Sequence, residues 1–292
     1  MLVKKAGTIL VNLDTKKIAL VYRDKLQDTS FPKGHVEGGE TFEECAVRET
    51  EEETLRANHL LITEPIYTLK YYNPSAKEDI ICKMYLAADD GPTSKKINEN
   101  DVENLEWTDF DDIENLLSYD NLKQEWNKVK VGIKSLLDNG GKLSASILTD
   151  LGICPTCYDR QNNHCIYGDN SSQLLFENND FECFLCGNPR SIGHTIISSK
   201  KHYKDMLEIP DDLCCEIFVF AKKAMNIIKE VYGSESVYLC TMCDGPMNHF
   251  HIQLIPRYSF EKRGSSNFVK QRLPYKEDLS KVNELRKLLN SN

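Results

Sequence analysis

Three glutamates with helical spacing form the first candidate site. Glu49, Glu52 and Glu53 lie at positions i, i+3 and i+4 of the segment TFEECAVRETEEETLR, so in a helix they share one face. Like charges at this spacing repel, which means that either water screens them or a cation lies among them. Converging carboxylates are the ligands that Mg²⁺ or Mn²⁺ prefers. A solvated acidic face is the alternative that the spacing leaves open.

The segment NHFHIQLIPRY holds a second candidate site. His249, His251 and Gln253 occupy alternate positions in it, and in a strand alternate side chains point to one face. A lone histidine would indicate little, but two histidines and a glutamine on one face indicate a polar site on a sheet.

A third group of residues has the spacing of a metal site. Cys154 and Cys157 enclose a Pro-Thr pair, and this C-x-x-C knuckle is suited to zinc. Three other groupings compete with it: Cys183 with Cys186, Cys240 with Cys243, and His164 with Cys165. The two cysteine pairs lie in strand-like runs, where residues three apart face opposite ways. Most of the other cysteines are expected to be small core residues.

The elements that position the glutamates fill the first half. AGTILVNLD and KIALVYRD predict a hairpin with a turn near Thr15–Lys16, and strand-like runs follow at PIYTLKYYN and IICKMYLAA. The acidic segment predicts a helix, and 112–138 predicts one continuous helix that ends at Asn139. The residues of the acidic helix expected to face inward are Phe42, Cys45, Ala46 and Thr50. We place the domain boundary between 140 and 150, with domains at 1–142 and 150–292.

The second half begins with a loop, CPTCYDRQNNHC, followed by strand-like runs in LLFENNDFECFL and GHTIISSKKH. A helix is predicted from an acidic N-cap near Asp211 to Gly233. SVYLCTMCDG and HFHIQLIPRY then predict paired strands, and EDLSKVNELRKLLN predicts a C-terminal helix.

Composition and charge limit the functions available. The 292 residues contain no apolar run long enough to span a membrane, and the N-terminus lacks the pattern of a signal peptide. Eleven cysteines without an export signal predict a reducing, cytoplasmic location. Residues 1–150 carry a net charge of −9 and residues 151–292 a net charge of 0. This distribution argues against long nucleic acid as a partner but not against a small polyphosphate whose charge is carried by bound metal.

The acidic segment resembles the Nudix box, which runs Gly-x5-Glu-x7-Arg-Glu-apolar-x-Glu-Glu-x-Gly-apolar. Six of its nine defined positions match, and FPKGHVEGGE resembles the loop of the diadenosine tetraphosphate hydrolase branch. Thr50, Leu55 and Arg56 depart from the pattern. Because the missing glycine is physically a C-cap, we expect the helix to run on or to end differently at Leu55.

This resemblance implies an α/β/α sandwich and a set of roles. Glu49, Glu52 and Glu53 would bind Mg²⁺ or Mn²⁺ with the Gly34 carbonyl as a further ligand, and Glu49 or Glu52 would carry the catalytic role of activating water. The remaining assignments are Glu40 and Arg48 as residues that orient the carboxylates, and Lys33 and Lys83 as phosphate contacts.

The second half resembles the histidine-triad (HIT) superfamily, whose signature is His-x-His-x-His. With glutamine third, as in HFHIQ, the motif is similar to that of the nucleotidyltransferase branch, which includes galactose-1-phosphate uridylyltransferase and dinucleoside polyphosphate phosphorylases. The resemblance implies an α+β domain with an antiparallel sheet. It also implies a structural Zn²⁺ held by Cys154, Cys157, His202 and His249.

In that superfamily the middle histidine attacks phosphorus and forms a covalent intermediate. The resemblance gives this role to His251 and a hydrogen bond to the phosphoryl oxygens to Gln253. Asn178 and Asn248 would contact substrate, although a polar turn is an equal alternative for Asn178.

Both resemblances together imply a bifunctional enzyme of nucleoside or dinucleoside polyphosphates. A metal-dependent pyrophosphohydrolase would be joined to a nucleotidyltransferase or hydrolase, with a homodimer through the second domain as a further expectation. Two alternatives stay open: an enzyme of RNA 5′ ends, and a nucleotide sensor with a degenerate site.

Overall fold

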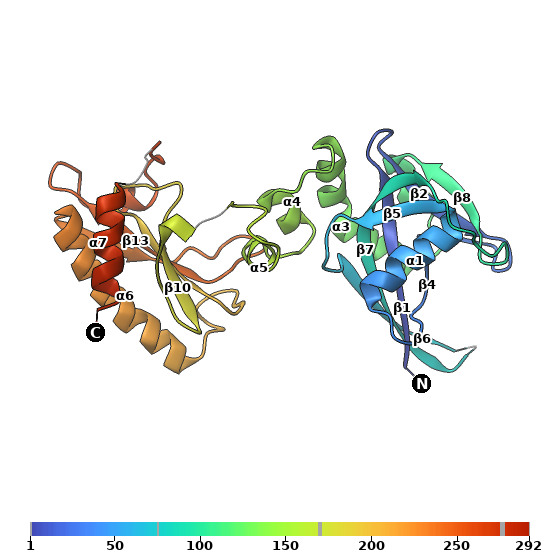
Figure 1. The fold of residues 1–292 in the computed structure, drawn as a ribbon, viewed down its shortest axis with the longest axis horizontal. Helices are drawn as coiled ribbons and strands as arrows, with labels where there is room; N and C mark the ends of the chain where they lie inside the picture. The colour runs from blue at the N-terminus through green and yellow to red at the C-terminus, as the bar shows by residue number, and fades with distance from the viewer. Residues whose placement is uncertain (1, 75, 169–170, 275–277, 292) are drawn as a thin grey trace. The chain divides into compact units, whose positions relative to one another are not determined.

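The computed structural model describes residues 2–74, 76–168, 171–274 and 278–291 of the chain (Figure 1). It divides into two compact units, Met1–Pro155 and Thr156–Asn292. Each unit has its own sheet, and each is described by itself below.

The first unit is built on one mixed sheet. Its eight strands are β1 (Leu2–Asn12), β2 (Lys17–Arg23), β3 (Asp28–Ser30), β4 (Lys33–His35), β5 (Arg56–Leu60), β6 (Tyr67–Asn73), β7 (Glu78–Pro92) and β8 (Asn104–Thr108). The main order is β3-β2-β1-β7-β5, with β4 on β1, β6 on β7 and β8 on β2. The central pair β1 and β7 is parallel, with Ile9 beside Leu86.

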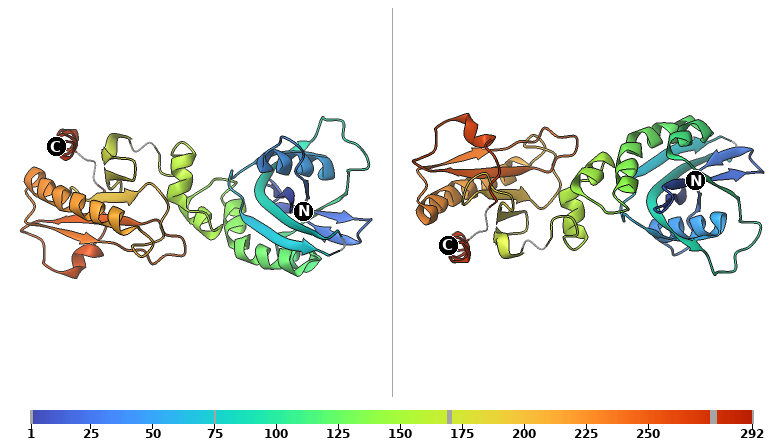
Figure 2. Two further views of the ribbon diagram at one scale, coloured as in Figure 1. Left: turned by 90° about the horizontal axis from the view of Figure 1, so that it is seen from below. Right: turned by 90° about the horizontal axis from the view of Figure 1, so that it is seen from above.

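Helices cover both faces of this sheet. They are α1 (Phe42–Thr54), η1 (Phe110–Asp112), α2 (Ile113–Leu116), α3 (Asp120–Asp138) and α4 (Ala145–Asp150). Figure 2 shows α1 and α3 on opposite sides of the strands. The Thr8 and Thr50 hydroxyls are 2.9 Å apart, which fixes β1 under α1, and on α3 the buried Trp126 packs against Phe31. Both faces of β1 are therefore buried from Ala6 to Val11, which explains the mostly apolar sequence of that stretch.

Two predictions for this unit are confirmed. The hairpin of β1 and β2 pairs Val11 with Ile18 and turns through Lys16 at a φ of 57°. Helix α1 begins at Thr41 with a capping box, in which the Thr41 hydroxyl accepts from the Glu44 N–H and the Glu44 carboxylate accepts from the Thr41 N–H. The four residues expected to face inward are buried or partly buried: Phe42, Cys45, Ala46 and Thr50.

The expectation for Leu55 is wrong. Leu55 adopts the left-handed conformation, with φ 56° and ψ 29°, and its N–H donates to the Glu51 carbonyl at 2.9 Å. The leucine thus takes the backbone geometry of the glycine that it replaces, and α1 ends at Thr54. A side chain at this geometry is strained because its Cβ crowds the following carbonyl.

The single helix predicted over 112–138 is also wrong. The chain leaves helical geometry at Leu117, whose ψ is 129°, and α3 starts at Asp120. Ser118 pairs with the β3 backbone instead, because its N–H donates to the Thr29 carbonyl at 3.1 Å and its hydroxyl accepts from the Thr29 N–H at 2.8 Å. This long-range pairing overrides the local helical pattern.

The second unit contains an antiparallel sheet of order β12-β13-β11-β10-β9. Its strands are β9 (Leu174–Glu177), β10 (Phe181–Leu185), β11 (Thr195–Ser199), β12 (Ser236–Cys240) and β13 (His251–Arg257). Its helices are α6 (Asp211–Tyr232), α7 (Leu279–Leu289), η2 (Ser171–Gln173) and η3 (Ser265–Phe268), and α5 (Pro155–Gln161) leads into it. The predicted pairing of β12 with β13 is confirmed, with Leu239 opposite Leu254.

One face of this sheet packs on α6 and α7, which bury Ile217, Phe220, Val282 and Leu285 against it. Helix α7 also covers β9, the edge strand of this sheet. The Arg286 Nε donates to the Leu174 carbonyl at 2.9 Å. The Asn290 Nδ2 donates to the Leu175 carbonyl at 2.9 Å.

Three local details of this half were predicted differently. Part of the CPTCYDRQNNHC segment is the helix α5 rather than a loop. Helix α6 ends at Gly233 as predicted, but its N-cap is Pro210, which offers no side-chain acceptor, and the acidic residues Asp211 and Asp212 lie in its first turn. The predicted C-terminal helix starts at Leu279, with Asp278 as its N-cap, and Glu277 lies outside the described residues. No helix among the described residues is long and apolar enough to cross a membrane.

We expect Leu55→Gly to stabilise the first unit by about 1 kcal/mol relative to Leu55→Ala. Both changes remove the same side chain beyond Cβ, but only glycine relieves the strain of the left-handed geometry. Both tryptophans, Trp107 and Trp126, lie in the first unit, so denaturation followed by tryptophan fluorescence reports on that unit. Equal midpoints for the two variants would show that Leu55 is not strained.

Candidate functional sites

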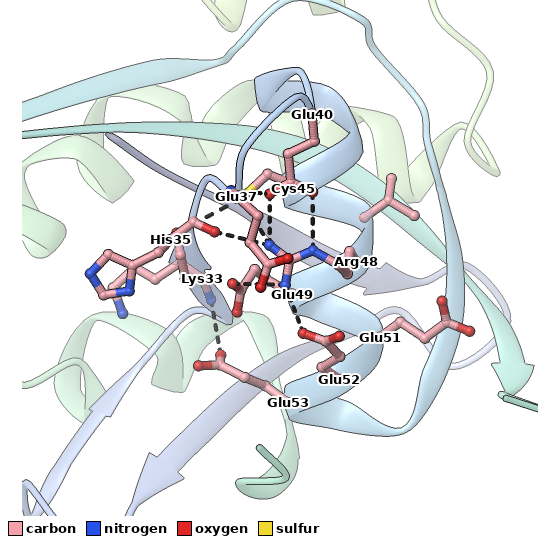
Figure 3. A network of polar contacts seen from close by, with 12 residues as sticks. Lys33, His35, Glu37, Glu40, Cys45, Arg48, Glu49, Glu51, Glu52 and Glu53 are labelled. Atoms are coloured by element: carbon pink, nitrogen blue, oxygen red, sulfur yellow. Dashed lines mark hydrogen bonds and ion pairs between the residues drawn. The ribbon is translucent and has the colours of Figure 1, made fainter. Parts of the chain in front are cut away.

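Arg48 organises the carboxylates of the first site (Figure 3). Its Nε and Nη2 donate to the two Glu40 oxygens at 3.0 and 2.7 Å. Its Nη1 donates to Glu49 Oε1 at 3.0 Å and to Glu52 Oε2 at 2.8 Å, and Nη2 also reaches the His35 carbonyl at 2.9 Å. One guanidinium thus holds three carboxylates and the loop that follows β4.

The loop between β4 and α1 is fixed by the same network. Glu40 Oε1 also accepts from the Glu37 N–H at 2.7 Å. The hydrogen bonds from Arg48 hold the pKa of Glu40 down at about 2, and the three carboxylates raise the pKa of Arg48. Glu40 therefore stays ionised and keeps Arg48 in place, which is what an orienting pair requires.

Glu53 is the most deeply placed of the predicted metal ligands. Its Oε2 accepts from the Lys33 N–H at 2.9 Å. Burial raises the pKa of Glu53, against the opposing effect of the Lys33 charge. Burial also raises the pKa of Glu49. Both carboxylates are thus held where ionisation is costly unless a further cation is close.

Gly34 leaves the space that the Glu49 carboxylate fills. A Cβ added to Gly34 would lie 1.9 Å from Glu49 Oε2, so any other residue there would displace this side chain. Carboxylate and carbonyl oxygens are the ligands that Mg²⁺ or Mn²⁺ prefers, so the donor chemistry of Glu49, Glu52, Glu53 and the Gly34 carbonyl fits such a cation. In the structure Glu49 and Glu52 accept from Arg48, whereas Glu53 accepts from the Lys33 N–H. The three carboxylates are therefore not gathered around one point, and they are not among the groups of described residues whose ligand atoms converge.

The two predicted phosphate-binding lysines lie apart from one another. The Lys33 ammonium donates to the Ser30 hydroxyl at 2.7 Å and to the Phe31 carbonyl at 3.3 Å, and burial lowers its pKa. Lys83 lies over the Phe42 ring at 4.4 Å, near the start of α1. The structure thus places Lys33 beside Glu53 and Lys83 at the other end of the helix.

On the second unit, His251 and Gln253 lie next to one another on β13. The His251 Nδ1 donates to the His249 carbonyl at 2.9 Å, so in the neutral ring the lone pair is on Nε2. This Nε2 is 3.4 Å from the Gln253 side-chain nitrogen. The arrangement fixes the ring and leaves the Nε2 lone pair facing the Gln253 amide.

Sequence reasoning missed His194, which is fully buried just before β11. Its Nδ1 accepts from the Arg190 N–H at 3.1 Å, and burial lowers its pKa to about 3. No spacing rule connects it with the HFHIQ motif, because the two segments are far apart in the sequence and meet through the pairing of β11 with β13.

The four predicted zinc ligands come together. One donor atom from each of Cys154, Cys157, His202 and His249 lies within 4.8 Å of the others. The Cys157 Sγ is 3.5 Å from His202 Nδ1 and 3.4 Å from His249 Nδ1. Tetrahedral zinc separates its ligand atoms by roughly 3.3–3.8 Å, so the donor set fits the ion with little movement.

Ser199 determines which nitrogen of His249 faces the cysteine. The His249 Nε2 donates to the Ser199 carbonyl at 2.7 Å, which leaves Nδ1 with its lone pair toward Cys157. A backbone partner of this kind is how metal-binding histidines are usually oriented.

The two predicted substrate asparagines both close turns. Asn178 Oδ1 accepts from the Asp180 and Phe181 N–H groups, and its amide donates to Glu216 at 2.9 Å. Asn248 exchanges two hydrogen bonds of 3.0 Å with the Gly245 backbone. The structure thus gives the two residues roles in positioning the loops beside the HIT-like motif.

Comparisons with known proteins find a domain match in each half of the chain. The NUDIX domain model matches residues 1–128 and the HIT domain model matches residues 168–260. An uncharacterized HIT-like protein of Methanocaldococcus jannaschii is 32% identical over 97 residues, which cover 32% of this chain and 74% of that protein. The protein named adenylylsulfatase HINT3 of Arabidopsis thaliana is 29% identical over 104 residues, which cover 32% of this chain and 53% of that protein.

Solved structures resemble each half. The C. elegans Ap4A hydrolase has 22% identity and a TM-score of 0.37, over 46% of this chain and 99% of that chain. A zinc-bound histidine triad family protein from Mycobacterium smegmatis has 18% identity and a TM-score of 0.34, over 40% of this chain and 82% of that chain. The chain therefore belongs to the HIT family, with a HIT domain matched at residues 168–260, and its residues 1–128 match the NUDIX domain model.

Proposed function

We propose that the chain is a bifunctional enzyme of nucleoside or dinucleoside polyphosphates. The NUDIX domain would be a metal-dependent pyrophosphohydrolase, and the HIT domain would transfer or hydrolyse a nucleotidyl group through His251. The observation that carries the proposal is the pair of prepared sites. One is a set of partly buried carboxylates held by Arg48, and the other is an imidazole with its Nε2 lone pair fixed by the backbone.

In the NUDIX domain, Glu49, Glu52, Glu53 and the Gly34 carbonyl would hold Mg²⁺ or Mn²⁺. When bound, the ion neutralises phosphate charge and lowers the pKa of a water molecule. Arg48 and Glu40 keep Glu49 and Glu52 in position. Glu49 has a pKa raised by burial, which suits a carboxylate that accepts a proton from the attacking water.

Glu52→Gln and Glu53→Gln should each lower the kcat of Mg²⁺-dependent hydrolysis at least a hundredfold. Each change keeps the side-chain size and removes one negative charge from the cation site. Glu51→Gln is the matched control, because Glu51 contacts Lys95 and Thr93 instead of Arg48 and points away from the cluster in Figure 3. Steady-state hydrolysis of a dinucleoside polyphosphate measures the effect. Full activity in Glu53→Gln would reduce the cluster to a solvated acidic surface.

In the HIT domain, His251 Nε2 would attack the α-phosphorus. An N–P bond forms as the bond from phosphorus to the leaving oxygen breaks, and the electron pair leaves with that oxygen. An acceptor oxygen, from phosphate, a sugar phosphate or water, then displaces the imidazole. Gln253 has no titratable proton near neutral pH, so it steadies the phosphoryl group by hydrogen bonding rather than by proton transfer.

Brief incubation with an α-labelled nucleotide substrate should label the protein on His251, with the acid-labile, base-stable behaviour of an N–P bond. His251→Ala should abolish the label, whereas His164→Ala, which changes a histidine paired with Asp159, should retain it. A suitable acceptor should discharge the label faster than water does. If no label forms and His251→Ala leaves turnover unchanged, the HIT domain acts as a nucleotide-binding module instead.

We also propose that Cys154, Cys157, His202 and His249 hold one structural Zn²⁺. The purified protein should then contain about one zinc per chain by elemental analysis, and Cys157→Ser should lose it. Cys165→Ser is the control, because Cys165 belongs to the same segment but not to the ligand cluster. Zinc-free wild-type protein, purified without chelators, would contradict the assignment.

A further inference from the structure

The sheet of the second unit has one face packed on helices and one face that carries the candidate site. Ile252 on β13 belongs to the core beneath α6, so its neighbours His251 and Gln253 point to the opposite face. Residues that pair directly across neighbouring strands share a face. Gln253 pairs with Ile196 on β11 and with Cys240 on β12. These three residues form a row across the strands, which we call the site row.

The segment 258–273, which follows β13, crosses the same face beside the site row. Tyr238 lies two positions before Cys240 on β12 and therefore faces the same way. The Tyr238 hydroxyl accepts from the Gly264 N–H at 3.1 Å, and its ring centroid lies 5.4 Å from that of Phe268. The segment is thus held against the sheet one row beyond the site row.

Two arginines join this segment to the loop between β10 and β11. Arg190 on the loop donates from Nη1 to the Lys270 carbonyl at 2.7 Å, and Arg272 on the segment donates from Nη1 to the Asn188 carbonyl at 2.6 Å. The Arg272 Nη1 also lies 3.5 Å from Cys186 Sγ. Each guanidinium reaches the backbone two residues from the other arginine, so the two positive charges lie close together.

The charges of this arginine pair are not matched by carboxylates. Both side chains are partly buried, and their hydrogen bonds go to two carbonyls and a thiol, with no ion pair to a described residue. The Arg190 Nε is buried without a hydrogen-bond partner in the described part of the chain. The neighbouring Lys270 differs, because its ammonium pairs with Glu261 at 2.6 Å. Partly buried cations without a counterion favour the binding of an anion.

The register of the strands gives the distance from the arginine pair to the site row. Phe184 on β10 pairs with Ile196, which places it in that row, and Cys186 lies two residues further along. The Cys186 N–H donates to the His194 carbonyl at 2.9 Å, so the contact between these two segments extends this far. Two strand spacings of about 4.8 Å and two residues of about 3.3 Å separate Cys186 from Gln253, which is roughly 12 Å. An anion at the arginines is therefore a different group from the one that reacts.

We propose that Arg190 and Arg272 form a second phosphate-binding site on this face. Its ligand is a phosphate group other than the one that His251 would attack, so the proposal rests on the proposed function. The group comes either from the substrate, as a chain of several phosphates or a nucleoside phosphorylated at both ends, or from a free phosphate that acts as acceptor. Arginine suits both, because its planar set of N–H donors binds phosphate oxygens in pairs.

Titration of the full chain with tripolyphosphate tests the site without turnover. In nitrogen-15 NMR without added divalent cation, the Nε–H signals of Arg190 and Arg272 should shift, both in the wild type and in His251→Ala. The Nε–H signal of Arg263, whose side chain is 82% exposed and pairs with Glu235 at 3.0 Å, should shift much less. Arginine signals at 190 and 272 that do not respond would overturn the proposal, and this test needs no variant at the site.

Variants measure the contribution of the charge and of the planar group. Arg272→Gln should weaken tripolyphosphate binding about tenfold, as read from the Arg190 signal, because one charge and its paired donors are lost. Arg272→Lys should lie between this variant and the wild type, since lysine keeps the charge but not the planar donor set. Arg263→Gln is the matched control and should bind as the wild type does. Equal affinity in Arg272→Gln and the wild type would contradict the site.

Covalent labelling of His251 then separates the two sources of phosphate. If the group belongs to the substrate, Arg272→Gln should raise the concentration for half-maximal labelling about tenfold and leave discharge unchanged. If it is a free acceptor, discharge by inorganic phosphate should slow about tenfold, with labelling and discharge by water unchanged. No change in any of the three rates would show that the arginines do not serve this reaction. A wild type that binds tripolyphosphate at the arginines but never labels would reject the proposed function and leave the phosphate site intact.

Discussion

Buried charge must be matched by a partner, and the first domain is arranged around that constraint. Glu40, Glu49 and Glu52 converge because Arg48 donates to all three. Without this guanidinium, the carboxylates would repel one another, and helix α1 would lose the bonds that Arg48 makes to Glu40 and to the His35 carbonyl. Glu53 lies beyond the reach of these bonds and is instead held by the Lys33 backbone. On the proposed function, the cation would bind where carboxylate charge remains unmatched by these partners.

The second domain meets the same constraint with neutral groups. His251, Gln253 and His249 are each oriented by a backbone carbonyl or a neighbouring amide rather than by an opposite charge. Fixed tautomers determine which group donates and which accepts each hydrogen bond. The desolvation penalty is small, because no charged group has to be buried. The two domains thus differ in how their polar side chains are held, one through charge pairs with Arg48 and the other through oriented neutral groups.

Site residues that lie on the same helix or strand could be predicted from the sequence. Residues from distant segments that contact one another could be identified only from the structure. The three glutamates and the HFHIQ motif were found from helical and strand spacing. Lys33 and Glu53 could be proposed singly, but their contact depends on how β4 meets α1. His194 was not predicted as a site residue because no residue pattern in its own segment indicates such a role. The break at Leu117 was not predicted because the pairing of Ser118 with β3 outweighs the local helical preference. The left-handed conformation of Leu55 was not predicted for a related reason, because there the chain turns from α1 directly into β5.

The C-terminal helix has a consequence for solubility. Arg286 and Asn290 occupy carbonyl groups of the edge strand β9, and Val282, Leu285 and Leu289 cover the apolar surface beside it. A chain cut before Asp278 would expose an unpaired strand edge and an adjoining hydrophobic surface at the same place. That combination favours pairing between strands of separate molecules. Shortened versions of this protein would therefore tend to associate through β9, even where both sets of site residues are intact.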